Sequence, residues 1–190
     1  MATIHTVIKN YSRYPRDIVW ENAQDIEHVS CLHSRTNKSF DLLYAGKESG
    51  SRYQYDTLIY KTTRRVYFLT IHTFGFRRIL SDYHIQQIEH IPLLGVTSAL
   101  NSLLRETENS EYPTMLLDEV VMEVPPIMAW FKKYIIKSLQ RHTAIQCQED
   151  ETFRERRFLL QQKEIKLPFR IFNQSTYSLL CAQFRESISN

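Results

Sequence analysis

The chain has 190 residues, 43% of them hydrophobic and 24% charged, a composition typical of one globular domain with a sizeable apolar core. Its 24 basic and 21 acidic residues leave a net charge of +3, so it lacks the concentrated positive surface of most nucleic-acid-binding proteins, and no nucleic-acid partner is expected. The arginine clusters at residues 64–65, 77–78 and 154–157 are short and interrupted, and we interpret them as solvated faces.

No segment has the composition of a leader or of a membrane span. Residues 1–10 lack the apolar run of a signal peptide, and no stretch approaches the roughly 18 apolar residues of a membrane helix. Cys31, Cys147 and Cys181 are odd in number and have no metal-binding spacing. We therefore expect reduced thiols in a cytoplasmic protein.

The first predicted elements are a strand and a short helix. Apolar and polar residues alternate from Ile4 to about Asn10, which predicts a strand. Asp17 is a candidate N-cap for a helix that runs to the neighbourhood of His28. Residues 34–38 are interpreted as a loop.

The middle of the chain is predicted to form antiparallel strands. Residues 40–46, 53–61, 66–76 and 79–88 are rich in β-branched and aromatic side chains. Residues 47–51 and 62–65 are expected turns between neighbouring strands. Residues 96–106 fit either a helix or a broken strand, and residues 115–124 predict one more strand that ends at two prolines.

A long helix is predicted after those prolines. Ile127, Phe131, Ile135 and Leu139 recur every four residues, which indicates a helix from about residue 127 to about residue 163. Pro168 would end this region, and residues 168–190 are expected to form a packed tail. The order of elements predicts a single α+β domain over residues 1–190.

One motif carries chemistry. Glu21, Asn22, Asp25, His28 and His33 form the pattern E-N-x-x-D-x-x-H-x-x-x-x-H. On an unbroken helix the two histidines would face apart, so the helix must break or tighten between them to direct both imidazoles to one point. Two histidines and one carboxylate suit Fe(II) that activates oxygen, and Asp25 is spaced to accept the other ring N–H of His28, with Glu21 one turn further back.

This spacing resembles the iron motif of the catalytic domain of Rieske-type non-haem iron oxygenases. The resemblance implies the helix-grip fold of the START and Bet v 1-like proteins, a curved antiparallel sheet wrapped around a long C-terminal helix and an apolar cavity. It also implies a third iron ligand on that helix. The segment at residues 148–157 is similar to the corresponding family segment, so that Asp150 would join His28 and His33 on Fe(II), with Asp25 as a catalytic residue and Glu21 and Asn22 in support.

The implied activity is hydroxylation or demethylation of a hydrophobic or aromatic small molecule. The chain departs from the family in one respect. The Cys-x-His and Cys-x-x-His pairs that hold a [2Fe–2S] cluster in Rieske domains are missing. The resemblance therefore implies that a separate ferredoxin or reductase supplies the electrons, and it leaves the oligomeric state open.

Other interpretations remain beside the iron site. His28 and His33 could be ordinary polar residues of a helix-grip protein without metal. Asp150 could pair with Arg154, four residues further on, or Glu149 or Glu151 could replace it as ligand. Without an iron site the chain would be a carrier or sensor of a hydrophobic ligand, and some of its aromatic side chains, from 10 Phe, 11 Tyr and 2 Trp, would line the cavity.

Overall fold

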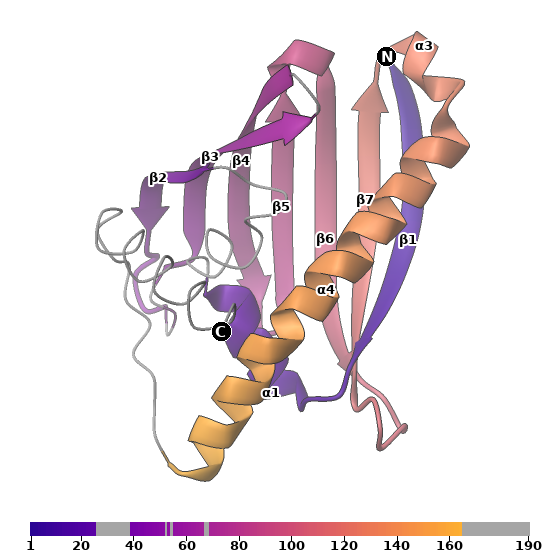
Figure 1. Cartoon of the computed structure of the whole chain (residues 1–190). Helices are drawn as coiled ribbons and strands as arrows, with labels where there is room; N and C mark the ends of the chain where they lie inside the picture. Colours follow the sequence, from indigo (N-terminus) through magenta and orange to yellow (C-terminus); the bar gives the residue numbers. More distant parts are fainter. Residues whose placement is uncertain (26–38, 52, 54, 67–68, 165–190) are drawn as a thin grey trace, which may run out of the picture.

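The computed structural model describes residues 1–25, 39–51, 53, 55–66 and 69–164, and its main feature is one antiparallel sheet. The sheet has seven strands in the order β1-β7-β6-β5-β4-β3-β2, and α4 crosses one of its faces diagonally (Figure 1). The strands are β1 (Ala2–Ser12), β2 (Ser39–Gly46), β3 (Thr57–Val66), β4 (Leu69–Ser81), β5 (His84–Ile91), β6 (Val96–Glu106) and β7 (Thr114–Val124). The helices are α1 (Arg16–Gln24), the 3-10 turn η2 (Pro92–Leu94), α3 (Pro126–Ala129) and α4 (Lys132–Gln162). The predicted helix-grip fold is confirmed.

The apolar core lies under the N-terminal half of α4. Strand alternation directs every second side chain of β1, β6 and β7 toward the helix, and these positions hold Ile4, Val96 and Val124, which are almost fully buried. From α4, Ile135 and Leu139 pack against them. Burying such side chains stabilises the fold by about 1.5–3 kcal/mol each.

The strand boundaries differ from the prediction around β3 and β4. The expected turn at residues 62–65 lies inside β3, which pairs with β4 through Val66. Polar residues such as Thr62, which is buried on the inner face of the sheet, resemble a turn in sequence although the chain is extended there. The gap between the predicted strands at residues 66–76 and 79–88 lies inside β4, and the turn between β4 and β5 follows Ser81, where Tyr83 has a left-handed φ of 63°.

Tyr83 and the start of α1 hold one another. Arg16 lies over the Tyr83 ring at 3.9 Å from its centroid, and the Tyr83 hydroxyl donates to Asp17 at 2.6 Å. The interpretation of Asp17 as the N-cap is wrong: Pro15 is the N-cap residue, and Asp17 lies in the first turn, where a negative charge is favoured by the helix dipole. These contacts offset the strain of a non-glycine residue at positive φ.

Residues 96–106, which fitted either a helix or a strand, form β6. The strand pairs along its length with both β5 and β7. Leu100, Leu103 and Leu104 favour a helix by their spacing, but on the strand Leu100 and Leu104 share one face with Ser102 and Leu103 lies on the other. Pairing on both sides decides the conformation, because an interior strand fills the backbone hydrogen bonds of its two neighbours.

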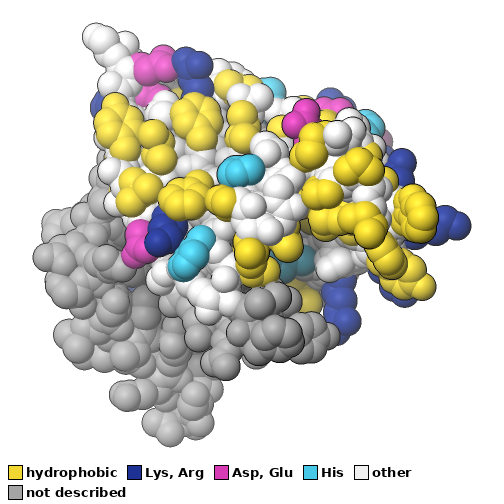
Figure 2. All heavy atoms as spheres, turned by 90° about the horizontal axis from the view of Figure 1, so that it is seen from above, with side chains coloured by type: hydrophobic (Ala, Val, Ile, Leu, Met, Phe, Trp, Pro, Cys, Tyr) yellow, Lys and Arg dark blue, Asp and Glu magenta, His cyan; other side chains and the backbone are white. Residues whose placement is uncertain are grey.

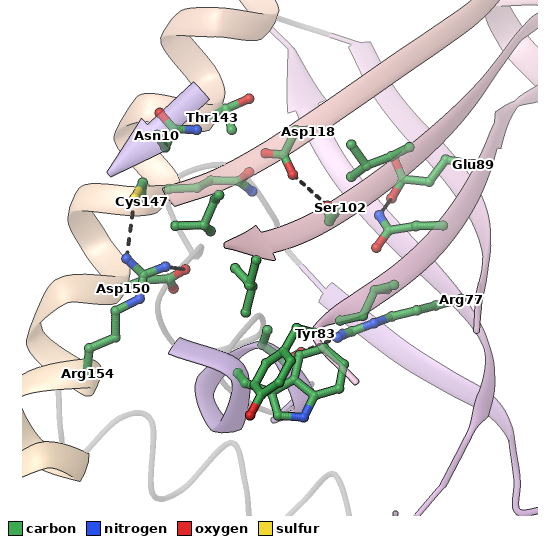
Figure 3. A pocket seen from close by; sticks show the side chains of 18 of the residues that line it. Asn10, Arg77, Tyr83, Glu89, Ser102, Asp118, Thr143, Cys147, Asp150 and Arg154 are labelled. Carbon is green, nitrogen blue, oxygen red and sulfur yellow. Dashed lines mark hydrogen bonds and ion pairs between the residues drawn. The ribbon is translucent and has the colours of Figure 1, made fainter. Parts of the chain in front are cut away.

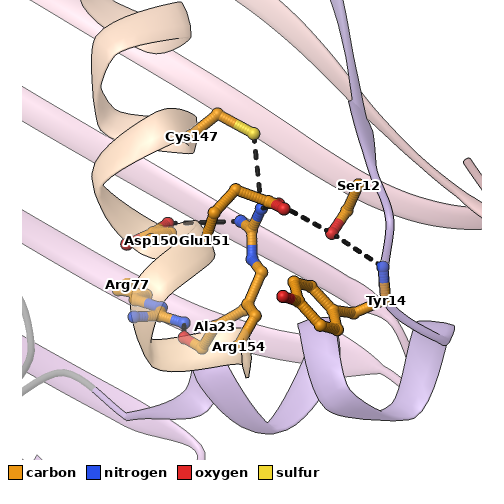
Figure 4. Close-up of polar contacts among 8 residues, drawn as sticks. All are labelled: Ser12, Tyr14, Ala23, Arg77, Cys147, Asp150, Glu151 and Arg154. Carbon is orange, nitrogen blue, oxygen red and sulfur yellow. Dashed lines mark hydrogen bonds and ion pairs between the residues drawn. The ribbon is translucent and has the colours of Figure 1, made fainter. Parts of the chain in front are cut away.

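The predicted helix of about residues 127–163 occurs as α3 and α4. Ion pairs and hydrogen bonds of buried arginines hold the C-terminal half of α4 in place. Arg154 is 2% exposed, donates to Glu151 at 2.9 Å and forms an ion pair with Asp150 at 3.2 Å. Ser12, the last residue of β1, donates to the same Glu151 carboxylate at 2.9 Å (Figure 4). The network thus ties α4 to the end of β1.

Two further arginines contact the C-terminal end of α1. Arg157 of α4 forms an ion pair with Asp25, the residue that follows α1. Arg77 of β4 donates to the carbonyl oxygen of Ala23. Carbonyls in the last turn of a helix have no partner inside it, and cations are favoured at this end of the helix dipole.

The interpretation of the arginine clusters as solvated faces is wrong for Arg77, Arg154 and Arg157, which are all buried. Their neighbours Arg78 and Arg156 are exposed. Strand alternation places Arg77 and Arg78 on opposite faces of β4. The three-residue spacing of Arg154 and Arg157 brings both to the same face of α4. The side chains of residues 64 and 65, the predicted tail at residues 168–190 and the predicted loop at residues 34–38 lie outside the described part of the chain.

Among the described helices, none is both long enough and apolar enough to cross a bilayer.

Replacing Arg154 tests whether charge fastens α4. We expect Arg154→Ala to lower the free energy of unfolding by about 3 kcal/mol, because it leaves two partly buried carboxylates without their cation. Urea unfolding followed by circular dichroism measures this change. Arg156→Ala, at the exposed neighbour, is the matched control and should change the stability by less than about 0.5 kcal/mol. Small effects at both positions would contradict the role of the network.

Candidate functional site

A cavity of about 230 Å³ lies between α4, α1 and the inner face of the sheet (Figure 3). Its lining is apolar toward α1 and the ends of the strands and polar toward the middle of the sheet and α4. The lining residues are Asn10, Trp20, Ala23, Phe40, Tyr60, Thr62, Arg77, Tyr83, Ile85, Gln87, Glu89, Leu100, Ser102, Leu104, Leu116, Asp118, Thr143, Gln146, Cys147, Asp150 and Arg154.

One wall of the cavity is built from stacked aromatic rings. Phe40 of β2 stacks on Tyr60 of β3 with ring centroids 5.0 Å apart. Tyr60 lies over Gly75, its partner on β4, where an added Cβ would come within 2.1 Å of the ring. Gly75 therefore permits this close approach within the sheet, and the Tyr60 hydroxyl then reaches Glu89 at 2.9 Å.

Asp118 is a buried carboxyl on the cavity wall. It faces inward from β7 opposite Ser102 of β6, whose hydroxyl donates to Oδ1 at 2.6 Å. Burial raises the pKa of Asp118, and the hydrogen bond from Ser102 opposes that rise. The described residues supply no ion pair to this carboxyl. Such a group donates a hydrogen bond toward the cavity when it is protonated and accepts one when it is ionised.

Several other polar atoms on the lining are buried without a hydrogen-bond partner in the described part of the chain. They are the side-chain nitrogen of Asn10, the hydroxyl of Thr62 and Nε of Arg154. A buried polar atom without a partner costs about 1–3 kcal/mol. Partners from the contents of the cavity, either water or a polar ligand, would remove this cost.

Arg77 and Cys147 also lie on the lining, and both are in unreactive forms. Burial lowers the pKa of the Arg77 guanidinium, but an arginine keeps its charge at physiological pH and here serves α1. Burial raises the pKa of the Cys147 thiol, and the Arg154 cation opposes that rise. A buried neutral thiol is a poor nucleophile.

The structure places the predicted iron-site residues on two elements. Glu21 and Asn22 lie on α1, Asp25 follows it, and Asp150 lies on α4. α1 ends at Gln24, and Asp25 already has an extended backbone. His28 and His33 belong to residues 26–38, as does Cys31, and lie outside the described residues.

The two predicted carboxylates are engaged by arginines. Asp25 pairs with Arg157, and Asp150 pairs with Arg154 as the alternative interpretation of the sequence predicted. A guanidinium on a carboxylate competes with a metal cation for the same oxygens and repels it. Within the described residues, no three His, Cys, Asp or Glu side chains come together to hold a metal. These residues alone do not fit an iron site, and the full ligand set stays a prediction.

Sequence reasoning missed the most distinctive group of the cavity. Asp118 stands in the inward series of β7 between Leu116 and Val120, so a charged residue breaks an otherwise apolar alternation. That break is a usable signal for a cavity group. Its partner Ser102 could not be found, because residues 96–106 did not clearly predict a strand.

Comparisons with known proteins support the fold. No protein-family model and no curated protein matches this sequence. A structure from Thermus thermophilus is similar with a TM-score of 0.58 at 12% identity, over 83% of this chain and 97% of that chain. Ara h 8.0201 has a TM-score of 0.60 at 8% identity over 80% and 98%. The Zhui aromatase/cyclase of a Streptomyces species has a TM-score of 0.59 at 14% identity over 83% and 96%. Identities this low show the helix-grip fold alone.

The raised pKa of Asp118 predicts a pH-dependent stability. The folded chain holds the Asp118 proton more tightly than the unfolded chain does, so the resulting stability is present below the unfolded pKa of about 3.9 and is lost as pH rises through the folded pKa. Asp118→Asn removes this loss and keeps the shape of the side chain. We expect the variant to gain stability relative to the wild type as the pH rises from about 4 to about 7.

Urea unfolding at a series of pH values measures the difference between the two proteins. Glu123→Gln is the control, because Glu123 lies on the same strand and is exposed. A difference between Asp118→Asn and wild type that is constant with pH would contradict the assignment of a raised pKa.

Proposed function

We propose that this protein binds a small hydrophobic molecule with at least one ring and one polar substituent in the cavity under α4. The observation that carries the proposal is the mixed lining, in which an apolar aromatic wall faces buried polar atoms that lack partners within the described chain. Binding sites for small molecules combine such walls with a few placed polar groups.

The size of the cavity limits the ligand. An apolar cavity of about 150 Å³ accommodates benzene, so about 230 Å³ corresponds to one or two rings. The rings would lie against Phe40 and Trp20, and a hydroxyl or carbonyl substituent would face Asp118. A protonated Asp118 donates to a carbonyl, whereas the ionised form accepts from a hydroxyl.

The comparisons support this class of ligand. The Streptomyces structure with the same fold is named an aromatase/cyclase, a name that refers to ring-containing products. Its wall residues need not be shared with this chain at 14% identity. The fold supplies the cavity, while the residues of this chain set its size and polarity.

The binding function is better supported than the oxygenase. The carboxylates that the oxygenase needs, Asp25 and Asp150, are paired with arginines, and the binding function uses groups that the structure describes. The iron ligands His28, His33 and Asp150 remain a prediction. So do the ferredoxin or reductase partner and the oligomeric state.

Filling the cavity tests the binding site directly. Leu100 points into the cavity and its neighbour Leu103 points to the other face of β6. We expect Leu100→Trp to weaken the binding of naphthol, two fused rings with one hydroxyl, by at least about tenfold because the indole occupies the same volume. Leu103→Trp, the matched control, should leave the affinity within about twofold of wild type. Fluorescence titration of naphthol measures both.

No binding of naphthol by wild type, or equal loss in the two variants, would contradict the proposed site. Circular dichroism of both variants separates a blocked cavity from a misfolded chain.

Metal content separates the binding function from the oxygenase. We expect naphthol affinity to be unchanged by a chelator and by His28→Ala, because neither alters the described lining of the cavity. Mass spectrometry of untagged protein, purified anaerobically and supplied with Fe(II), measures iron at the same time. About one iron per chain that is lost in His28→Ala, together with chelator-sensitive affinity, would favour the oxygenase instead.

A further inference from the structure

A second surface lies at the corner of the molecule where α3 leads into α4. Three large apolar side chains there are mostly exposed: Trp130 at 88%, Tyr134 at 76% and Ile127 at 69%. Single exposed hydrophobic residues are ordinary, but a contiguous group marks an interaction site. Seen from above, hydrophobic side chains gather at this corner with Lys and Arg side chains beside them (Figure 2).

A second segment extends the same surface. An added Cβ on Gly95 would lie 3.8 Å from the ring of Pro125, so the turn η2 sits next to the start of α3. Leu93 of η2 is 61% exposed. We call Leu93, Ile127, Trp130 and Tyr134 the apolar tip. Two segments more than thirty residues apart in sequence thus present apolar side chains at one end of the molecule.

Basic side chains predominate around the apolar tip, where Glu123 at the end of β7 is the nearest exposed acidic residue in sequence. Residues 124–148 contain no Asp or Glu, and Lys132, Lys133, Lys137 and Arg141 are all exposed on α4. The chain as a whole has nearly equal numbers of acidic and basic residues, so this stretch departs from its average. Exposed aromatic side chains with basic side chains beside them are complementary to an anionic surface with an apolar interior.

We propose that the apolar tip docks on an anionic lipid bilayer. Trp and Tyr are favoured at the level of the lipid headgroups, where one part of the ring is in an apolar medium and the other is hydrated. Lysines extend their ammonium groups to lipid phosphates and carboxylates while their stems cover apolar surface. Lysine is depleted in the interfaces between proteins, so three lysines beside the tip favour a membrane over a protein partner.

The mode of attachment follows from the helices. The described chain has no helix able to span a bilayer, so the protein would lie on the membrane and detach at high salt, as surface-bound proteins do when attraction to anionic lipids is screened. Tyr134 of the apolar tip lies at the start of α4, and the middle of α4 lines the cavity.

Co-sedimentation of the full chain with vesicles tests the proposal. We expect binding to vesicles of phosphatidylcholine and phosphatidylserine in a roughly 7:3 ratio, weak binding to phosphatidylcholine alone, and release at about 1 M salt. A combined Trp130→Ala, Tyr134→Ala variant should lose at least about tenfold in bound fraction. A Lys132→Gln, Lys133→Gln, Lys137→Gln variant should lose the preference for phosphatidylserine.

The tryptophans provide an independent readout. The chain has two, and Trp20, on α1, is already buried in the core. A shift of tryptophan emission to shorter wavelength on addition of mixed vesicles therefore reports Trp130, and it should be absent in Trp130→Phe. A Lys9→Gln, Tyr11→Ala variant on the outward face of β1 is the matched control, and it should bind vesicles as wild type does.

Three results would overturn the proposal. The first is no binding of wild type to mixed vesicles, and the second is binding that the tip variants leave unchanged. The third is a lipid-free dimer, seen by analytical ultracentrifugation, that Trp130→Ala dissociates, which would assign the tip to a second copy of the chain. Circular dichroism of each variant confirms that the fold is intact.

Discussion

The structure depends on how one long helix is held against a curved sheet with two different kinds of contact. Near its N-terminus α4 packs on an apolar core through Ile135 and Leu139. Near its C-terminus its buried side chains are Arg154 and Arg157, which reach carboxylates on α4 itself and after α1. Buried arginines are costly without such partners. The position of the helix is therefore specified by directional ion pairs as well as by the burial of apolar surface.

This division explains why the cavity lies where it does. The apolar packing ends near the middle of α4, and the arginine network begins beyond it, so the helix bridges the space between. Side chains that would fill a core are replaced there by shorter polar ones such as Ser102 and Thr143. Among them, Asp118 accepts a hydrogen bond from the Ser102 hydroxyl and has no cation beside it in the described chain. It is therefore the group most suited to recognise a polar substituent of a ligand.

Much of the fold could be predicted from the sequence, because alternation on β1 and β7 and the four-residue repeat of α4 are local patterns. These patterns predict an α+β domain, whereas the helix-grip fold, which the structure confirms, was implied by the resemblance of the iron motif. The boundary of β3 could not be found, since the polar residues in its C-terminal half resemble a turn in sequence. The site was less predictable: Arg154 and Arg77 look like surface charges until the partner strand or helix is known, and the histidines of the predicted iron motif lie outside the described residues.

The edge position of β1 has a consequence for how this chain folds. β1 pairs with β7, in a register that joins Ala2 to Val124, and Ser12 bonds Glu151, 139 residues away. β1 must therefore wait for β7 and α4, which are synthesised more than 100 residues later, before it finds its partners. Such distant contacts slow folding, since each requires closure of a long loop before any contact stabilises it. β1 stays unpaired while the five strands before β7 are synthesised, a state in which chaperones commonly act.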